Sequence, residues 1–240
     1  MEWYKLFLFL MTGLLVIAVV SAAPSGPTTV STLGSSRYST AAAGNVSAIA
    51  GNVTEINFAA NSITQTWQGY FGNITGTIVL GNSNNQSLYN WNLASPSGEI
   101  YATRSSTTPT WTNIRCANLT ETNAEDTTLG VNQTADQDSV NRTFLNTTSF
   151  NVFYVGSTII NTSQNCRAVN LFNGTGASSS SFQEVLLSDA SGSTLVYTSL
   201  LANDANGFDN RTHDFEMIVG ENGHSGDTTA TPYYFYLELQ

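Results

Sequence analysis

The stretch "GTIVLGNSNNQSLYNWNLASPSGEIYATR", residues 76–104, decides the fold class. An apolar run at 76–80 leads into a loop rich in Gly and Asn, and a Ser-Pro-Ser-Gly turn at 95–98 precedes a third apolar run at 99–104. Strand-length runs separated by short loops of this composition are typical of antiparallel hairpins. We therefore predict three successive strands. In the second strand, large residues alternate and are expected on the core face: Tyr89, Trp91 and Leu93.

The same alternation of strands and turns continues to the end of the chain and indicates one all-β domain. Turn residues recur at steps of roughly ten, which is typical of a sandwich. We predict a single antiparallel β-sandwich, immunoglobulin-like or jelly-roll-like, over residues 43–240, after a flexible leader at 23–42. One short helix is expected around Asp136–Leu145. The other strands are expected at 53–58, 150–160, 185–188, 194–200, 215–219 and 233–239.

The closing strand, Tyr233–Leu239, combines aromatic and aliphatic residues that favour β-structure. A bare apolar edge strand pairs with other chains, so we expect this strand to be paired on both sides. An uncovered edge would instead be a candidate for strand addition between subunits.

The first 22 residues read as a secretory signal peptide. Lys5 precedes an apolar segment of 15 residues, Leu6–Val20, and small residues at 21–23 follow it. The alternative is a permanent anchor helix, but a membrane span needs roughly 20 apolar residues. We expect cleavage after Ala22 and a secreted, extracellular protein of the cell surface, with no membrane insertion after cleavage.

The charge of the chain argues against nucleic acid as a partner. The net charge is −10, and Lys5 is the only lysine in the sequence. Binding to phosphate groups needs clustered Lys and Arg, which this chain lacks. Other surface proteins, glycans or further copies of the chain are the expected partners.

Cysteine and asparagine usage agree with export. Cys116 and Cys166 are expected to form one disulfide, with Cα atoms roughly 4.4–6.8 Å apart, and two buried free thiols are the alternative. Composition rich in Asn, Ser and Thr raises the number of chance N-glycosylation motifs, but behind a signal peptide they indicate a glycosylated surface. Most of the eleven acceptors are expected to be exposed: Asn45, Asn52, Asn73, Asn85, Asn118, Asn132, Asn141, Asn146, Asn161, Asn173 and Asn210.

Several blocks, in order, resemble a family of secreted archaeal surface proteins: "WQGYFGNITGTIVL", "LYNWNLASPSGEIYATRS", "DSVNRTF", "FQEVLLSD", "LVYTSLL", "GFDNRTHDFEMIVGENG" and "YYFYLEL". The resemblance covers residues 43–240 and implies a cell-surface location and a single-unit architecture. Because the family is uncharacterised, it implies no catalytic residue. The chain departs from the family at 219–222, where it reads Val-Gly-Glu-Asn in place of Val-Pro-Glu-Asn.

Aromatic residues beside glycines make a carbohydrate site one hypothesis. Sugar rings stack on exposed aromatic faces while hydroxyls bond to neighbouring amides. Trp67, Gln68 and Tyr70 are the candidate ligand contacts, and a sheet rim with core aromatics is the alternative.

A structural calcium ion is considered at Asp204, Asn206 and Asp209, which supply alternating carboxylate and amide oxygens around a Gly turn. A plain Asn-Gly hairpin turn with solvated acids is the favoured alternative. We expect no other cofactor.

Enzymatic chemistry receives little support. His213-Asp214 suggests a triad, but neighbours in a strand point to opposite faces and no G-x-S-x-G motif is present. A glycosidase would need two carboxylates across a cleft. The glutamates considered for this role are Glu99, Glu184, Glu216 and Glu238.

Together these features predict a structural or adhesive protein of the cell surface that is not an enzyme. A carbohydrate-binding module is the alternative function, and a secreted hydrolase is the third.

Overall fold

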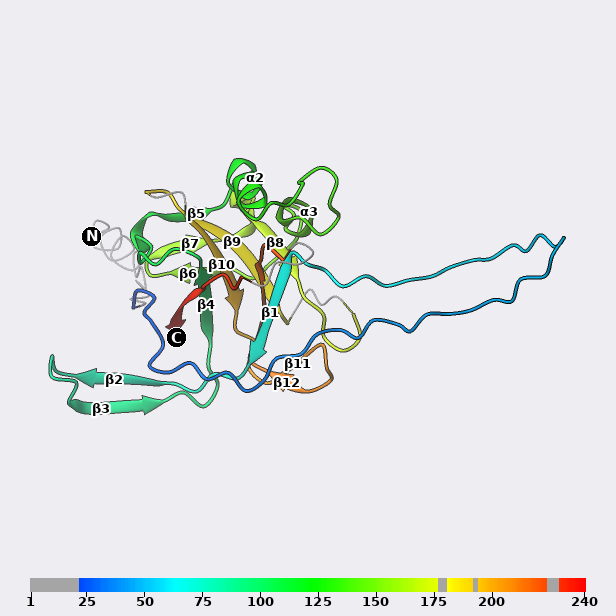
Figure 1. Ribbon diagram of the computed structural model, residues 1–240. Helices are drawn as coiled ribbons and strands as arrows, with labels where there is room; N and C mark the ends of the chain where they lie inside the picture. The colour runs from blue at the N-terminus through cyan, green and yellow to red at the C-terminus, as the bar shows by residue number, and fades with distance from the viewer. Residues whose placement is uncertain (1–21, 177–180, 192–193, 224–228) are drawn as a thin grey trace, which may run out of the picture.

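The computed structural model describes residues 22–176, 181–191, 194–223 and 229–240, so most of the predicted signal peptide lies outside the described residues (Figure 1). One antiparallel sheet of six strands forms the centre of the molecule, in the order β14-β4-β10-β9-β5, with β8 also paired to β9. Its strands are β4 (Gly98–Thr103), β5 (Ile114–Cys116), β8 (Arg167–Asn170), β9 (Gln183–Asp189), β10 (Thr194–Leu200) and β14 (Tyr234–Leu239).

Each face of this sheet carries its own apolar core, because alternate residues of a strand point to opposite faces. One core contains Leu186 and Tyr197, and the other contains Val185 and Val196. Every residue of β9 is buried as a result. The sheet is therefore covered on both sides, which keeps its middle strands out of water.

Different elements cover the two faces. β1 (Trp67–Gly72) pairs with β13 (Phe215–Gly220), and this antiparallel pair lies over the face of Tyr197. A hairpin of β6 (Phe153–Val155) and β7 (Thr158–Ile160) covers the other face. The prediction of an all-β antiparallel fold is confirmed, and its assignment to an immunoglobulin-like or jelly-roll type stays a prediction.

The helical content differs from the prediction of one helix at Asp136–Leu145. That region contains the short α3 (Val140–Thr143), but the longer α2 (Leu119–Thr128) was not predicted. The reason is that α2 lacks an apolar stripe and buries polar residues instead. A capping box formed by Asn118 and Glu121 starts α2.

Hydrogen bonds to polar side chains join α2 to α3 and to Arg104, which follows β4. Asp126 on α2 accepts from the backbone N–H groups of Val140 and Asn141, at the beginning of α3. Glu125 on α2 accepts two hydrogen bonds from the Arg104 guanidinium, at 3.0 and 2.5 Å. Buried charge-assisted bonds of this kind hold a helix that apolar packing would not hold.

Two strand predictions and one prediction of a strand's position were wrong. Residues 53–58 are not a strand, and 150–160 is the β6–β7 hairpin rather than one strand, because the chain turns at Gly156 (φ +57°). Tyr233–Leu239 is a strand, but β14 lies at the edge of the sheet. Among the described residues it pairs with β4 on one side and, on the other, with Ser25 through an isolated bridge.

The smaller elements complete the chain. Cys116 and Cys166 form the predicted disulfide, with their Cα atoms 4.8 Å apart. Short 3₁₀ turns lie at Trp111–Asn113 and Thr162–Gln164. The remaining strands are β2 (Thr77–Gly81), β3 (Ser87–Asn92), β11 (Ala205–Asn206) and β12 (Thr212–His213).

Candidate functional site

The β2–β3 hairpin projects from the body of the molecule (Figure 1). All residues of both strands are exposed, and the two strands pair only with one another among the described residues. Its loop is fixed by Asn82, whose Oδ1 accepts from the N–H groups of Asn84 and Gln86. The hairpin carries large exposed apolar side chains: Ile78, Val79, Leu80, Leu88, Tyr89 and Trp91.

This exposure corrects the prediction that Tyr89 and Trp91 lie in the core, while Leu93, just after β3, is half-buried. Tyr89 and Trp91 form an edge-to-face pair with ring centroids 4.8 Å apart. The sequence predicted the two strands and the loop between them but not their exposure, because alternation was taken to mean one buried face.

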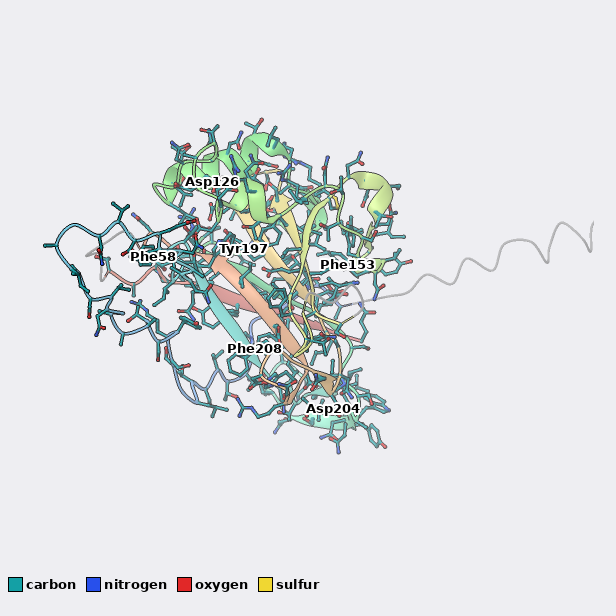
Figure 2. The ribbon with its side chains drawn as sticks, turned by 90° about the vertical axis from the view of Figure 1, so that its right-hand side faces the viewer. Phe58, Asp126, Phe153, Tyr197, Asp204 and Phe208 are labelled. Carbon is teal, nitrogen blue, oxygen red and sulfur yellow. A yellow bond between two sulfur atoms is a disulfide. The ribbon has the colours of Figure 1, made fainter. Side chains whose placement is uncertain are left out.

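A second exposed feature is the extended segment that joins Ser25 to β1, which we call the arm (residues 26–64). Figure 1 shows that it runs far out from the body and returns, and Figure 2 shows Phe58 outside the packed strands, whereas Tyr197 lies among them. Val53 is 100% exposed and Phe58 88% exposed. Neither residue lies in a helix or strand.

The predicted ligand contacts at Trp67, Gln68 and Tyr70 do not converge on one exposed surface. Trp67 is half-buried and its indole N–H donates to the carbonyl oxygen of Asp138 at 2.6 Å. Tyr70 is half-buried against the core. Gln68 is exposed and donates to the carbonyl of Gly69. The opening of β1 therefore forms the rim of the core, and ligand contact there stays a prediction.

The predicted calcium ligands have other partners. Asp209 forms an ion pair with Arg211. Its Oδ1 atom also lies 2.9 Å from Nε2 of the His213 ring. Asp204 adopts the left-handed conformation (φ +51°). In the part of the chain that the structure describes, no group of three or more His, Cys, Asp or Glu side chains could hold a metal ion. Calcium at Asp204, Asn206 and Asp209 stays a prediction.

The His213-Asp214 pair is not assembled as a triad. The Asp214 carboxylate accepts from the backbone N–H groups of Ile74 and Asp204 at 2.7 and 3.0 Å, so it ties β13 to two loops. His213 contacts Asp209 instead and packs on the ring of Phe71. Both residues therefore serve local structure in this arrangement.

The four glutamates considered for acid–base chemistry are all buried, but they do not form one cluster. Glu99 and Glu238 are register partners on β4 and β14. Burial, together with the neighbouring Glu238 carboxylate, raises the pKa of Glu99 to about 8. Glu184 projects to the opposite face of the sheet, where complete burial raises its pKa well above the usual range. Each glutamate interrupts an apolar strand sequence, a signal visible before the structure.

None of the eleven predicted glycosylation asparagines is buried: eight are exposed, and Asn141, Asn161 and Asn173 are half-buried. This confirms the predicted exposure. At Asn132, Asn161 and Asn173 the Ser or Thr hydroxyl of the motif donates to the Asn Oδ1 atom. The amide nitrogen, which is the atom that a glycan modifies, stays free of those bonds.

Comparison with known proteins gives no match: no family model, no curated protein and no solved structure is similar to this chain. Within the described residues, no helix is long and apolar enough to cross a membrane.

Proposed function

We propose that this chain is an exported, N-glycosylated structural protein of the cell surface that associates with copies of itself. The observation that carries the proposal is the β2–β3 hairpin, whose large apolar side chains are exposed and whose strands pair only with one another among the described residues. An isolated two-stranded hairpin is marginally stable in water. Contiguous exposed apolar residues mark interaction sites. A second copy that covers the hairpin accounts for both features.

The arm and the β14 edge support the same proposal. Leu237 exchanges two backbone hydrogen bonds with Ser25 on the side away from β4. Alternate residues of a strand direct their N–H and C=O groups to the same edge, so Phe235 and Leu239 face that open side as well. Residues 53–58 include strand-forming residues but have no strand partner among the described residues. Addition of this segment to the β14 edge of another copy would pair both.

Export and glycosylation rest on the sequence and agree with the structure. The disulfide between Cys116 and Cys166 belongs to an oxidising compartment. The exposed glycosylation motifs belong to a surface that a glycan can occupy. Intact-mass measurement of the protein from its native source tests this part, and a mass equal to that of the peptide contradicts it.

Self-association is tested by light scattering over a range of protein concentrations. Leu88→Ser removes the most exposed apolar side chain of the hairpin, at 81% exposed. Leu119→Ser removes an exposed leucine, 52% exposed, from α2 and is the matched control. We expect Leu88→Ser to weaken association at least tenfold while Leu119→Ser leaves it unchanged. Equal behaviour of the two variants would contradict the proposal.

A carbohydrate-binding function is the second candidate, and one observation favours it. The exposed rings of Tyr89 and Trp91 form an edge-to-face pair on one face of the hairpin. Exposed aromatic faces can stack on a sugar ring. A glycan-array screen decides: binding that Trp91→Ala abolishes and Leu88→Ser preserves supports this function.

A further inference from the structure

Two carboxylates lie side by side where β14 pairs with β4. Glu238 is the register partner of Glu99, and they are 2% and 4% exposed. Directly opposed residues of an antiparallel pair have Cβ atoms about 4.5–5.5 Å apart. Two ionised carboxylates at this separation, away from water, repel one another unless a proton or a cation neutralises the pair.

Hydrogen-bond donors of the protein reach both oxygens of Glu238 but not Oε2 of Glu99. The Gly156 N–H lies 3.0 Å from each oxygen of Glu238, and the Tyr101 hydroxyl donates to Oε2 of Glu238 at 3.1 Å. Both carboxylate oxygens of Glu238 therefore have a hydrogen-bond donor. The Oε2 atom of Glu99, in contrast, is buried and has no hydrogen-bond partner in the described chain. A buried acceptor left unpaired is costly and marks a place where a bound group completes the bonding.

Glu99 also lines an open pocket of about 370 Å³ at the end of β4 and β10. Neutral side-chain oxygens in the wall of the pocket come from Asn151, Tyr154, Ser181, Gln183 and Gln240, and that of Gln183 already accepts from the Asn151 N–H. Carboxylate, amide and hydroxyl oxygens are the ligands that hard divalent cations prefer, and Ca²⁺ takes six to eight of them. The net charge of −10 favours a cation over an anion as the occupant.

We propose that this pocket binds a divalent cation of the calcium class. Glu99 supplies the anchoring carboxylate, and neutral oxygens of Asn151 and Ser181 supply further ligands. Glu238 lies outside the pocket lining, beside Glu99 on the neighbouring strand. The cation relieves the repulsion between the two carboxylates and gives the unpaired oxygen a partner. The site is distinct from the one that the sequence suggested near Asp204.

The test uses the full-length protein, first treated with EDTA and then titrated with Ca²⁺. We expect the midpoint of thermal unfolding to rise with Ca²⁺ concentration, because a ligand that binds the folded state stabilises it. Tb³⁺ serves as a luminescent substitute, and Tyr101, which is bonded to Glu238, is placed to sensitise its emission. An unfolding midpoint that Ca²⁺ does not move, with no sensitised Tb³⁺ emission, would overturn the proposal.

Two isosteric variants separate this pocket from general attraction to an acidic surface. Glu99→Gln removes the anchoring charge and is expected to weaken binding of Ca²⁺ and Tb³⁺ at least tenfold. Glu184→Gln changes a glutamate that is equally buried but faces the opposite core, and it is expected to keep the Ca²⁺ shift. A Glu99→Gln variant with the wild-type shift would overturn the proposal, and so would equal loss in both variants.

Discussion

Tyr70 on β1 meets Phe235 on β14 edge to face, with their ring centroids 5.3 Å apart. The two strands belong to different sheets, so this contact joins the edge strand of the large sheet to the β1–β13 layer that covers it. Both rings are half-buried against the same core. The edge strand β14 is therefore stabilised by side-chain packing on its face as well as by its pairing with β4.

A double-mutant cycle on Tyr70→Leu and Phe235→Leu should reveal this link. Edge-to-face aromatic pairs contribute about 0.5–1.5 kcal/mol beyond area burial, so we expect a coupling free energy of that size. Denaturant unfolding measures it. The control cycle pairs Tyr70→Leu with Trp111→Leu, which lies in the other core, and should give coupling below about 0.5 kcal/mol.

Opening the disulfide between Cys116 and Cys166 should destabilise the fold strongly. The bond closes a sequence separation of 50 residues, and the chain-entropy model gives about 4 kcal/mol for such a loop. Guanidinium unfolding of the Cys116→Ser, Cys166→Ser double variant measures the loss. Near-identical free energies of unfolding with and without the bond would show that the unfolded chain stays compact in this region.

The free energy of unfolding of the metal-free protein should fall as the pH rises. Glu99 has a pKa of about 8 in the folded state against an ordinary value of 4.5, so the folded state holds a proton that the unfolded chain releases. Stability from this group is present below pH 4.5 and is lost up to about pH 8. The slope per pH unit is on the order of 1 kcal/mol.

Glu99→Gln should flatten this slope, because its amide does not titrate. Urea unfolding in EDTA at pH 5, 6, 7 and 8 measures the effect for both proteins. If wild type and variant lost stability in parallel over this range, another group, such as Glu184, would be responsible for the slope.

Much of the central sheet could be predicted from the sequence. The β4, β9 and β10 segments, and β13 in the layer that covers the sheet, combine β-branched and apolar residues with clear turn signals, and they form strands as predicted. Local patterns sufficed there because these strands are buried by neighbouring elements. The helix α2 could not be predicted in this way, since capping by Asn118 and long-range bonds to Arg104 hold it.

The candidate sites show the opposite balance. Alternation at Tyr89 and Trp91 correctly predicted a strand, but it could not show that the hairpin projects from the body, because that depends on which elements remain to cover it. Pairing between Glu99 and Glu238 depends on strand order, which connects residues 139 positions apart in the chain. A sequence pattern with period two identifies a strand face and not its neighbour.

The last prediction concerns the arm. Residues 53–58 have no strand partner in the described chain, so Ile56→Pro should leave the isolated fold intact, with a thermal midpoint within a few degrees of wild type. If this segment adds to the β14 edge of another copy, however, proline removes a ladder donor and should weaken association at least tenfold. Light scattering measures the association constant.

The matched control is Ile56→Thr, which keeps the backbone N–H and a β-branched side chain and should retain most of the association. Hydrogen exchange locates the acceptor edge: the Phe235 and Leu239 amides, which face away from β4, should become protected when the wild-type protein assembles and stay unprotected in Ile56→Pro. Assembly that is as strong in Ile56→Pro as in Ile56→Thr, with both amides still exchanging freely, would exclude strand addition at β14 and leave the hairpin as the contact between copies.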